Sequence, residues 1–222
     1  IAEIKGGITK DQKRKPSGAR AVPYLRVANV QRGYLDLSEM KEILATKEEI
    51  AELALRPGDI LFNEGGDRDK LGRGWVWSGQ IPVCIHQNHV FRARLYDHAL
   101  QPQFVSWYAN WLGQKFFFDK GKHTTNLASI SMSKLRLLPI PVPPPAEQIR
   151  IVVEVERFLS VIDALEVALD ASTRLLPEHA RGSVVFRVLA DGALLWESPL
   201  VRGGDAPLAL ARLDLAGKKE LV

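Results

Sequence analysis

Residues 139–176 read PIPVPPPAEQIRIVVEVERFLSVIDALEVALDASTRLL, and this stretch divides the chain into regions of different character. Each proline in it fixes its own φ and disfavours helix in the residue before it, which predicts an extended strap over residues 139–148. A helix can start only beyond the prolines, and residues 146–176 contain neither glycine nor proline. We therefore expect a long helical arm over residues 146–176.

The apolar residues of this arm recur in alternating steps of four and three. The series comprises Ile151, Val155, Phe158, Ile162, Leu165, Leu169 and Leu176, with Ser172 as its one polar member. Such a heptad seam packs one helix along another. A helix that packs on its own globular domain shares the pattern over a shorter length. The length of the series favours a coiled-coil arm, in which the residues from Ile151 to Leu169 form a subunit interface.

The residues before the strap mix short strand-like runs with polar loops that contain glycine. Runs rich in β-branched or aromatic residues predict strands over residues 24–30, 59–63, 75–77 and 83–94. Helices are expected over residues 47–53 and over residues 102–118, where apolar side chains recur at helical spacing. This combination predicts a mixed α+β domain over residues 1–145.

The sequence changes again after Pro177. Residues 183–189 alternate apolar and polar side chains in part, Asp191-Gly192 is a hairpin-type turn, and residues 193–196 continue as a second strand. Residues 177–222 are therefore expected to be a short, incomplete β-rich segment. The fold class predicted for the whole chain is α+β, with a mixed domain followed by a long coiled-coil-type helix and this segment.

Composition limits the classes of function. The 222 residues carry a net charge of +4, and residues 1–146 hold 21 Lys and Arg against 14 Asp and Glu, a net +7. A basic domain suits a polyanionic partner, although a solvated basic surface has the same composition. No apolar run is long enough to span a bilayer, and the single cysteine, Cys84, fits a reducing compartment. We expect a cytoplasmic protein that does not bind membranes.

The densest polar cluster occupies residues 63–74, NEGGDRDKLGRG, between two expected strands. Its glycines let the backbone approach a partner closely, Arg68, Lys70 and Arg73 can contact phosphates or guanine edges, and Asn63 can pair with adenine. The same composition also describes a long solvated hairpin loop. A Walker-type phosphate loop is disfavoured because the GxxxxGK[ST] spacing is absent.

Two further loops offer donors to a polyanion. Residues 120–126, KGKHTTN, place hydrogen-bonding side chains beside Lys120 and Lys122, and could equally cap the preceding helix. The basic arm over residues 10–15 has a solvated loop as its alternative.

Metal binding and catalysis have weaker support. Cys84, His86 and His89 lie at ligand-like spacing, but on a strand Cys84 and His86 face one side and His89 the other. No second cysteine exists to complete a zinc site. The acids Glu64, Asp67 and Asp69 could form a nuclease site with magnesium, yet a glycine-rich loop lacks the rigid support that such a site needs. We expect no catalytic and no metal-binding residue.

Four blocks in order carry a family resemblance. PYLRVANV at residues 23–30, GDIL at 58–61, GGDRDKLGRG at 65–74 and LPIPVPPPAEQ at 138–148 resemble the specificity subunits of Type I restriction-modification enzymes. The resemblance covers residues 1–176. It implies a target recognition domain that reads one half of a split DNA sequence, and a helix that sets the spacing between halves and docks the methyltransferase subunits.

The resemblance also implies partners and site residues. Double-stranded DNA, methyltransferase subunits, a restriction and translocase subunit, and a second recognition domain or a homodimer mate would be the partners. S-adenosylmethionine, ATP and magnesium would be bound by those subunits, with no cofactor in this chain. Base reading and backbone contact would fall to loop residues, with Asn63, Arg68 and Arg73 first among the base readers and Lys70, Lys120 and Lys122 on phosphate. The candidate DNA-binding residues are Lys10, Lys13, Arg14, Arg26, Asn29, Gln31, Asn63, Arg68, Lys70, Arg73, His86, Asn88, Lys120, Lys122, Thr124 and Asn126.

A second resemblance lies after the arm. VVFRVLADG at residues 184–192, LWES at 195–198 and LDLAGKKEL at 213–221 resemble the middle of a carbohydrate-binding module found beside glycosidases. Two alternatives to DNA recognition therefore stay open, namely a carbohydrate-associated β-module with an accessory first domain, and a self-contained metal-dependent nuclease.

Overall fold

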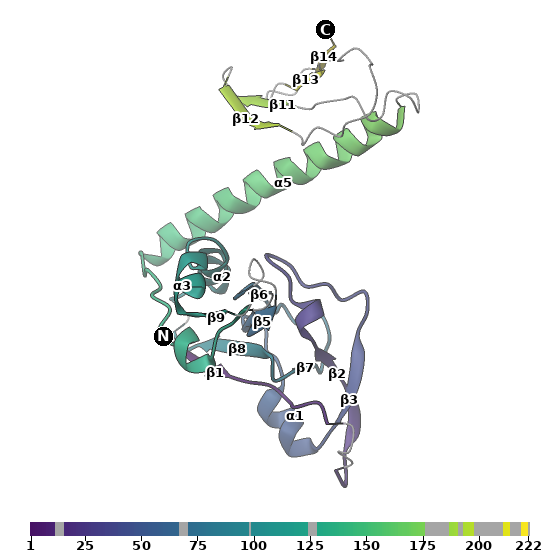
Figure 1. The fold of residues 1–222 in the computed structure, drawn as a ribbon, viewed down its shortest axis with the longest axis vertical. Coiled ribbons are helices and arrows are strands. Elements are labelled where there is room, and N and C mark those ends of the chain that lie inside the picture. Colours follow the sequence, from purple (N-terminus) through teal and green to yellow (C-terminus); the bar gives the residue numbers. More distant parts are fainter. Residues whose placement is uncertain are drawn as a thin grey trace. The chain divides into compact units, whose positions relative to one another are not determined.

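The computed structural model describes residues 1–11, 16–66, 71–97, 99–123 and 128–175, together with four short strands beyond them. The chain divides into two compact units, Ile1–Val155 (unit 1) and Glu156–Val222 (unit 2) (Figure 1). The expected boundaries at residues 145 and 176 stay predictions.

The core of unit 1 is a four-stranded antiparallel sheet with the order β1-β8-β4-β6. Its strands are β1 (Ala2–Lys5), β8 (Val90–Leu95), β4 (Ile60–Asn63) and β6 (Gly74–Val76). On β4 every residue is buried, and Phe62 lies opposite Phe91 on β8 and Gly74 on β6. Strand β4 is therefore the centre around which the rest of the domain is built.

Three helices pack on this sheet: α2 (Pro102–Trp111), α3 (Gln114–Lys120) and α4 (Met132–Leu135). They contribute Phe104, Phe117 and Leu135 to the same hydrophobic cluster as Phe62. One helix was expected over residues 102–118, whereas α2 ends at Trp111 and α3 begins at Gln114. The reason is Gly113, where an added Cβ would come within 2.7 Å of the Ala109 carbonyl oxygen, so only glycine permits this close turn.

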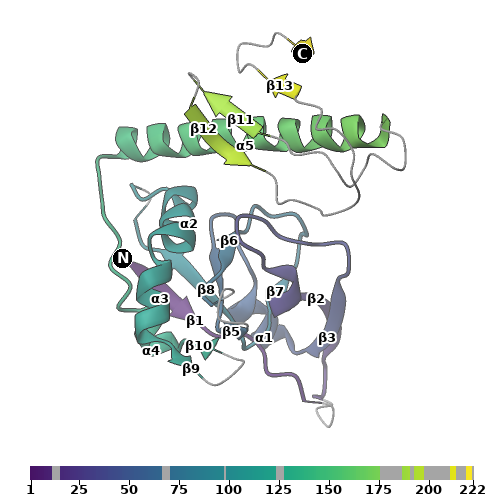
Figure 2. The ribbon, with the colours of Figure 1, turned by 45° about the horizontal axis from the view of Figure 1, so that its top comes forward.

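A second sheet, of order β3-β2-β7, lies on the other side of unit 1 (Figure 2). Its strands are β2 (Arg20–Leu25), β3 (Lys41–Ala45) and β7 (Ile85–His86), and α1 (Lys47–Leu53) follows β3. Helix α1 has the predicted bounds. Its start is a capping box, because Thr46 Oγ1 accepts from the Glu49 N–H while Glu49 Oε2 accepts from the Thr46 N–H.

Two expected strands are shorter than their sequence patterns indicate. The strand expected over residues 24–30 ends at Leu25, and a 3₁₀ turn (η1, Val27–Asn29) follows because Asn29 Oδ1 accepts from the Arg26 N–H. The strand expected over residues 83–94 is divided between β7 and β8. A turn separates them, in which the Val90 N–H donates to the Gln87 carbonyl.

A small three-stranded sheet joins loops that are distant in sequence. Strand β10 (Ala128–Ser129) pairs with β5 (Gly65–Gly66) on one side and with β9 (Lys122–His123) on the other. This sheet was not expected from the sequence, since each of its strands has only two residues.

Helix α5 (Pro145–Leu175) contains 31 residues. It begins within the expected strap, because proline is tolerated in the first helical turn, where its missing N–H would have no partner. The extended strap therefore ends at Pro144 and not at Gln148. In unit 2, β11 (Arg187–Ala190) pairs antiparallel with β12 (Ala193–Glu197), and β13 (Ala211–Leu213) with β14 (Lys219–Leu221).

The α+β class and the long helix are confirmed. Among the described residues, no helix is both long enough and apolar enough to cross a membrane.

Candidate nucleic-acid interface

The N-terminal loop and the loop over residues 86–89 are joined by backbone hydrogen bonds. The Ile8 N–H donates to the His86 carbonyl at 2.8 Å, and the Asn88 N–H donates to the Ile8 carbonyl at 2.9 Å. The Gln87 N–H in turn reaches the Leu25 carbonyl at 2.9 Å. Three segments of the expected interface therefore meet at this point.

Glu64 connects two further loops to this group. Its N–H donates to the His89 carbonyl at 2.9 Å, and its carbonyl accepts from the Ile130 N–H at 2.7 Å. The next two residues, Gly65 and Gly66, pair with β10, which pairs with Lys122 and His123 on β9. The loops that begin at Asn63 and at Lys120 are thus held together by the small sheet.

The loop after β2 is bonded to the loop over residues 63–74. The Asn63 side-chain amide donates to the Val27 carbonyl at 3.1 Å and to the Val30 carbonyl at 2.8 Å, and Arg73 donates to the Val27 carbonyl at 3.3 Å. Five loops carry the candidate DNA-binding residues, around residues 10, 26–31, 63–73, 86–88 and 120–126, and the described parts of these loops are therefore neighbours in unit 1.

Three of the predicted DNA-binding residues have buried side chains, which corrects the prediction for them. Asn63 and His86 are 0% exposed and Asn29 is 2% exposed. Asn29 accepts from the Arg26 N–H and donates to the Asp36 and Glu39 carbonyls, so its amide shapes the loop. A base edge cannot reach these groups, and the prediction that Asn29, Asn63 and His86 contact DNA is wrong for this conformation.

His86 has the electrostatic character of an interior residue. Its Nδ1 lies 2.6 Å from the Val90 carbonyl oxygen, and its buried Nε2 has no hydrogen-bond partner among the residues that the structure describes. Burial lowers the pKa of His86 to about 4, because a charged imidazole would lose its hydration. The ring is therefore neutral at pH 7, and Nδ1 is the nitrogen that donates.

Other predicted residues are exposed or half-buried. Lys10, Lys120 and Lys122 are exposed, and Asn88 is half-buried. The side chains of Arg26 and Gln31 already donate to backbone carbonyls, to that of Glu39 at 2.8 Å and to that of Ala28 at 2.6 Å. The remaining predictions lie outside the described residues: Lys13, Arg14, Arg68, Lys70, Thr124 and Asn126. Contact of all these groups with DNA stays a prediction.

The structure adds a polar pair that the sequence patterns did not single out as a DNA contact. His89 Nδ1 lies 2.6 Å from Glu64 Oε2, and both side chains reach the surface, with exposed fractions of 55% and 31%. The two residues are 25 positions apart, so no local motif joins them. Over the described ranges, no three His, Cys, Asp or Glu side chains are grouped so that they could hold a metal ion.

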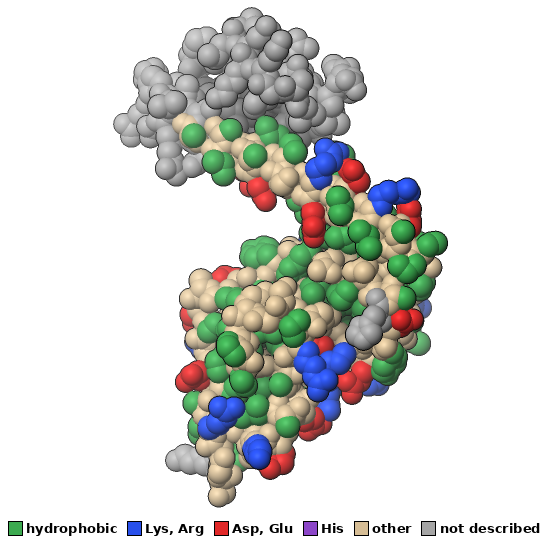
Figure 3. Space-filling model, turned by 180° about the vertical axis from the view of Figure 1, so that it is seen from behind, with side chains coloured by type: hydrophobic (Ala, Val, Ile, Leu, Met, Phe, Trp, Pro, Cys, Tyr) green, Lys and Arg blue, Asp and Glu red, His purple; other side chains and the backbone are tan. Residues whose placement is uncertain are grey.

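Charge is unevenly distributed over the surface of unit 1. Figure 3 shows Lys and Arg side chains in separate groups on the face seen from behind, with hydrophobic and neutral side chains between them. On β8, Arg94 donates two hydrogen bonds of 2.8 Å to the buried carboxylate of Asp59. The charge of this arginine is therefore paired with a buried acid.

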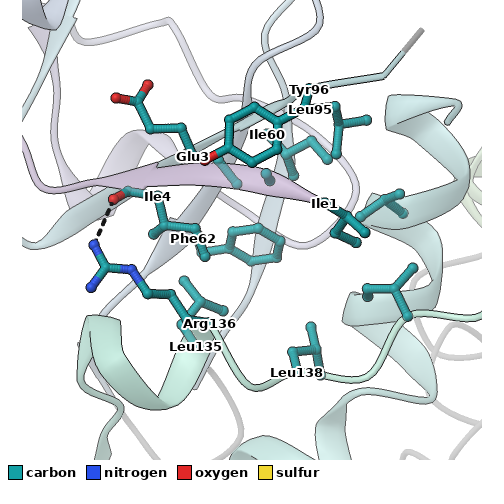
Figure 4. Close-up of a pocket in the computed structure, with 14 residues that line it drawn as sticks. Ile1, Glu3, Ile4, Ile60, Phe62, Leu95, Tyr96, Leu135, Arg136 and Leu138 are labelled. Atoms are coloured by element: carbon teal, nitrogen blue, oxygen red, sulfur yellow. Dashed lines mark hydrogen bonds between the residues drawn. The ribbon is translucent and has the colours of Figure 1, made fainter.

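An apolar pocket of about 360 Å³ lies between strands β1, β8 and β4 of the four-stranded sheet and the segment from Leu135 to Ile140 (Figure 4). It is lined by Ile4, Phe62 and Leu135 among others, and Arg136 donates across it to the Ile4 carbonyl at 3.2 Å. The Glu3 carboxylate points away from the apolar side chains of Ile4 and Phe62. The pocket therefore offers few polar groups for the recognition of a ligand.

The beginning of α5 is anchored to unit 1 through Gln148, which is fully buried. Its Oε1 accepts from the Gln101 N–H at 2.9 Å, and its Nε2 donates to the carbonyls of Ala99 at 3.2 Å and Pro143 at 2.8 Å. Val152 also packs against the core.

The heptad residues of α5 remain largely accessible in the single chain. Exposed fractions are 36% for Ile151, 58% for Phe158 and 48% for Ile162, whereas Val155 and Leu165 are half-buried. The side chain of Leu169 lies outside the described residues. A subunit interface on this seam stays a prediction.

Comparison with known proteins confirms both predicted resemblances. The NPCBM/NEW2 domain family matches residues 148–222. A type I restriction enzyme specificity subunit of Methanocaldococcus jannaschii is 24% identical over 181 residues, which are 81% of this chain and 41% of that protein. The chain thus spans about two fifths of the length of the curated relative that it matches.

Two solved structures share the fold. One comes from a study of complex assembly and conformational transition in the type I R-M system, and the other is the HsdS subunit from Thermoanaerobacter tengcongensis. Their TM-scores are 0.55 and 0.52 at 20% and 18% sequence identity. The alignments cover 78% and 76% of this chain, and 39% and 37% of those chains.

Proposed function

We propose that this chain recognises a specific DNA sequence as one recognition unit of a Type I specificity subunit, without catalytic activity of its own. The observation that carries the proposal is the meeting of five polar loops in one basic unit, since DNA is read by loops and strands that enter a groove together. The similarity to specificity subunits supports the same function. It supports neither of the two alternatives for the whole chain.

Within this proposal, contacts divide between phosphate and base edges. The exposed Lys10, Lys120 and Lys122 bind phosphate oxygens, which gives affinity that depends on salt but not on sequence. The Arg73 guanidinium donates to the Val27 carbonyl, so Arg73 lies where the loop over residues 63–74 meets the loop after β2. We assign base reading to Arg73 because of this position between two loops of the interface.

Direct binding tests the assignment of the lysines. Randomised duplex DNA is selected with the full chain in the absence of magnesium, and the affinity for the enriched sequence and for a scrambled one is then measured over a salt series. Lys120→Ala and Lys122→Ala should weaken both affinities alike and each lower the salt slope by about 1.

Lys47→Ala is the matched control, because this exposed lysine lies on α1 outside the proposed interface. A wild-type chain that enriches no sequence would refute DNA reading. Lysine variants that behave like Lys47→Ala would refute only the phosphate contacts.

The exposed heptad seam supports pairing of α5 with another helix, either from a second recognition domain or from a second copy. Methyltransferase subunits would dock on the paired helices, with S-adenosylmethionine, ATP and magnesium bound by the partner subunits. Phe158→Glu should abolish pairing, because it places a charge on a seam position that is 58% exposed in the single chain. Sedimentation and co-purification with a methyltransferase subunit measure this, and methylome sequencing should then reveal a new modified motif.

The family match over residues 148–222 supports a second candidate function for the C-terminal part alone, namely carbohydrate binding. A glycan array probed with the full chain tests it. Retention of a glycan that survives Lys120→Ala and Lys122→Ala would assign that binding to a surface other than the DNA interface.

A further inference from the structure

Glu64 occupies a fixed position where three loops of the proposed interface meet. Its N–H is bonded to the His89 carbonyl and its carbonyl to the Ile130 N–H, at 2.9 and 2.7 Å. It directly follows β4, whose residues are all buried. The main chain of Glu64 is therefore anchored from both sides, unlike that of a residue at the tip of a loop.

The carboxylate of Glu64 is also oriented. His89 Nδ1 holds Oε2 at 2.6 Å, while the Asn88 side-chain amide lies 3.4 Å from the other ring nitrogen of His89. Within the part of the chain that the structure describes, Oε1 accepts no hydrogen bond. With 31% of the side chain exposed, Glu64 presents an acceptor oxygen to the surface in a defined direction.

A carboxylate in an interface with DNA restricts what can lie opposite it. Phosphate oxygens and the carbonyl acceptors of guanine and thymine are repelled. The exocyclic amino groups of cytosine and adenine, which lie in the major groove, can donate to it. A fixed carboxylate among basic loops therefore disfavours bases that present acceptors and favours bases that present an amino group.

We propose that Glu64 is a specificity-determining residue that accepts a hydrogen bond from the exocyclic amino group of one target base, cytosine or adenine, and that His89 is its positioning residue. This inference rests on the proposed DNA recognition. It assigns a role in binding to a side chain that is not among the candidate DNA-binding residues predicted from the sequence.

The test is selection of randomised duplex DNA by the full chain, compared among the wild type, Glu64→Gln, His89→Gln and the control Glu52→Gln. Glu52 likewise has its carboxylate beside a nitrogen donor, 2.6 Å from Lys5 Nζ, but lies on α1. The wild type should require cytosine or adenine at one position, and which of the two it enriches identifies the amino group. Because glutamine can donate as well as accept, Glu64→Gln should accept guanine or thymine at that position, with discrimination reduced at least about fivefold.

His89→Gln should weaken the preference at the same position, and Glu52→Gln should leave every position unchanged. Thermal unfolding verifies that each variant is folded. A Glu64→Gln profile identical to the wild-type profile, or one weakened equally at all positions, would overturn the inference while leaving DNA recognition intact. If Glu64→Gln does not fold, the result for His89→Gln decides in the same way. A wild-type chain that selects no sequence would overturn the inference and the proposed function together.

Discussion

Replacement of Asn63 by alanine separates a structural from a base-reading role. The wild-type side chain is completely buried and donates to the carbonyls of Val27 and Val30. In Asn63→Ala both hydrogen bonds are lost. The Val27 carbonyl keeps Arg73 as a donor, whereas the buried Val30 carbonyl loses the hydrogen bond from Asn63.

The magnitude follows from these contacts. Two hydrogen bonds contribute about 1 kcal/mol each, and a buried carbonyl left without a donor costs about 1–3 kcal/mol, part of which is the same loss. We therefore expect Asn63→Ala to lower the free energy of unfolding by about 2–4 kcal/mol. For a chain of this size that corresponds to a decrease in Tm of roughly 4–16 °C.

Urea unfolding followed by tryptophan fluorescence measures the effect, and an unchanged m-value would show that the same surface is exposed on unfolding. Asn88→Ala is the control, because the Asn88 side chain is half-buried and its amide lies 3.4 Å from the ring of the exposed His89. Below the transition, Asn63→Ala should retain the wild-type base preferences. Wild-type stability combined with a lost preference at one base would refute the assignment of Asn63 to the core.

Three further predictions concern stability. His86 stays neutral in the folded state down to its pKa of about 4, whereas in the unfolded chain it takes up a proton below about 6.5. The free energy of unfolding should therefore fall by about 3 kcal/mol as the pH is lowered from 6.5 to 4. A His86→Asn variant whose unfolding has the same pH dependence as the wild type would contradict this prediction. Asp59→Ala should cost about 3 kcal/mol because it removes the buried partner of Arg94, and the additional change Arg94→Leu should restore part of the loss in urea unfolding. Gln148→Ala should lower the free energy of unfolding by about 2 kcal/mol, because three hydrogen bonds are lost. Hydrogen exchange should then show faster opening of the first turns of α5. Replacement of the exposed Ile149 by alanine is the control and should not have this effect.

Local signals in the sequence predicted several elements closely. Helix α1 was predicted with the bounds that it has, and the structure adds the capping box of Thr46 and Glu49 as the reason for its start. The prolines predicted both the strap and the start of α5 to within a few residues. Signals of this kind act over three or four positions, so they can be read without knowledge of the rest of the fold.

The candidate site was only partly predictable. Three of the loops were predicted from their composition and the other two from the family resemblance, and the structure brings the described parts of all five together. Yet Asn63, chosen as a base reader for its hydrogen-bonding groups, donates to carbonyls 36 and 33 positions away. A buried asparagine that bonds to distant backbone and an exposed one that binds a base have the same local sequence, because burial depends on residues elsewhere in the chain.

The sequence by itself determined the α+β class, the long helix and the resemblance to specificity subunits, because patterns of period and proline placement are local. Only the tertiary structure decided which polar side chains reach the surface. It buried Asn29, Asn63 and His86, and it paired Glu64 with His89 at the surface. The physical reason is that a polar group is satisfied either by water and a ligand or by backbone brought from elsewhere, and packing of the whole domain makes that choice.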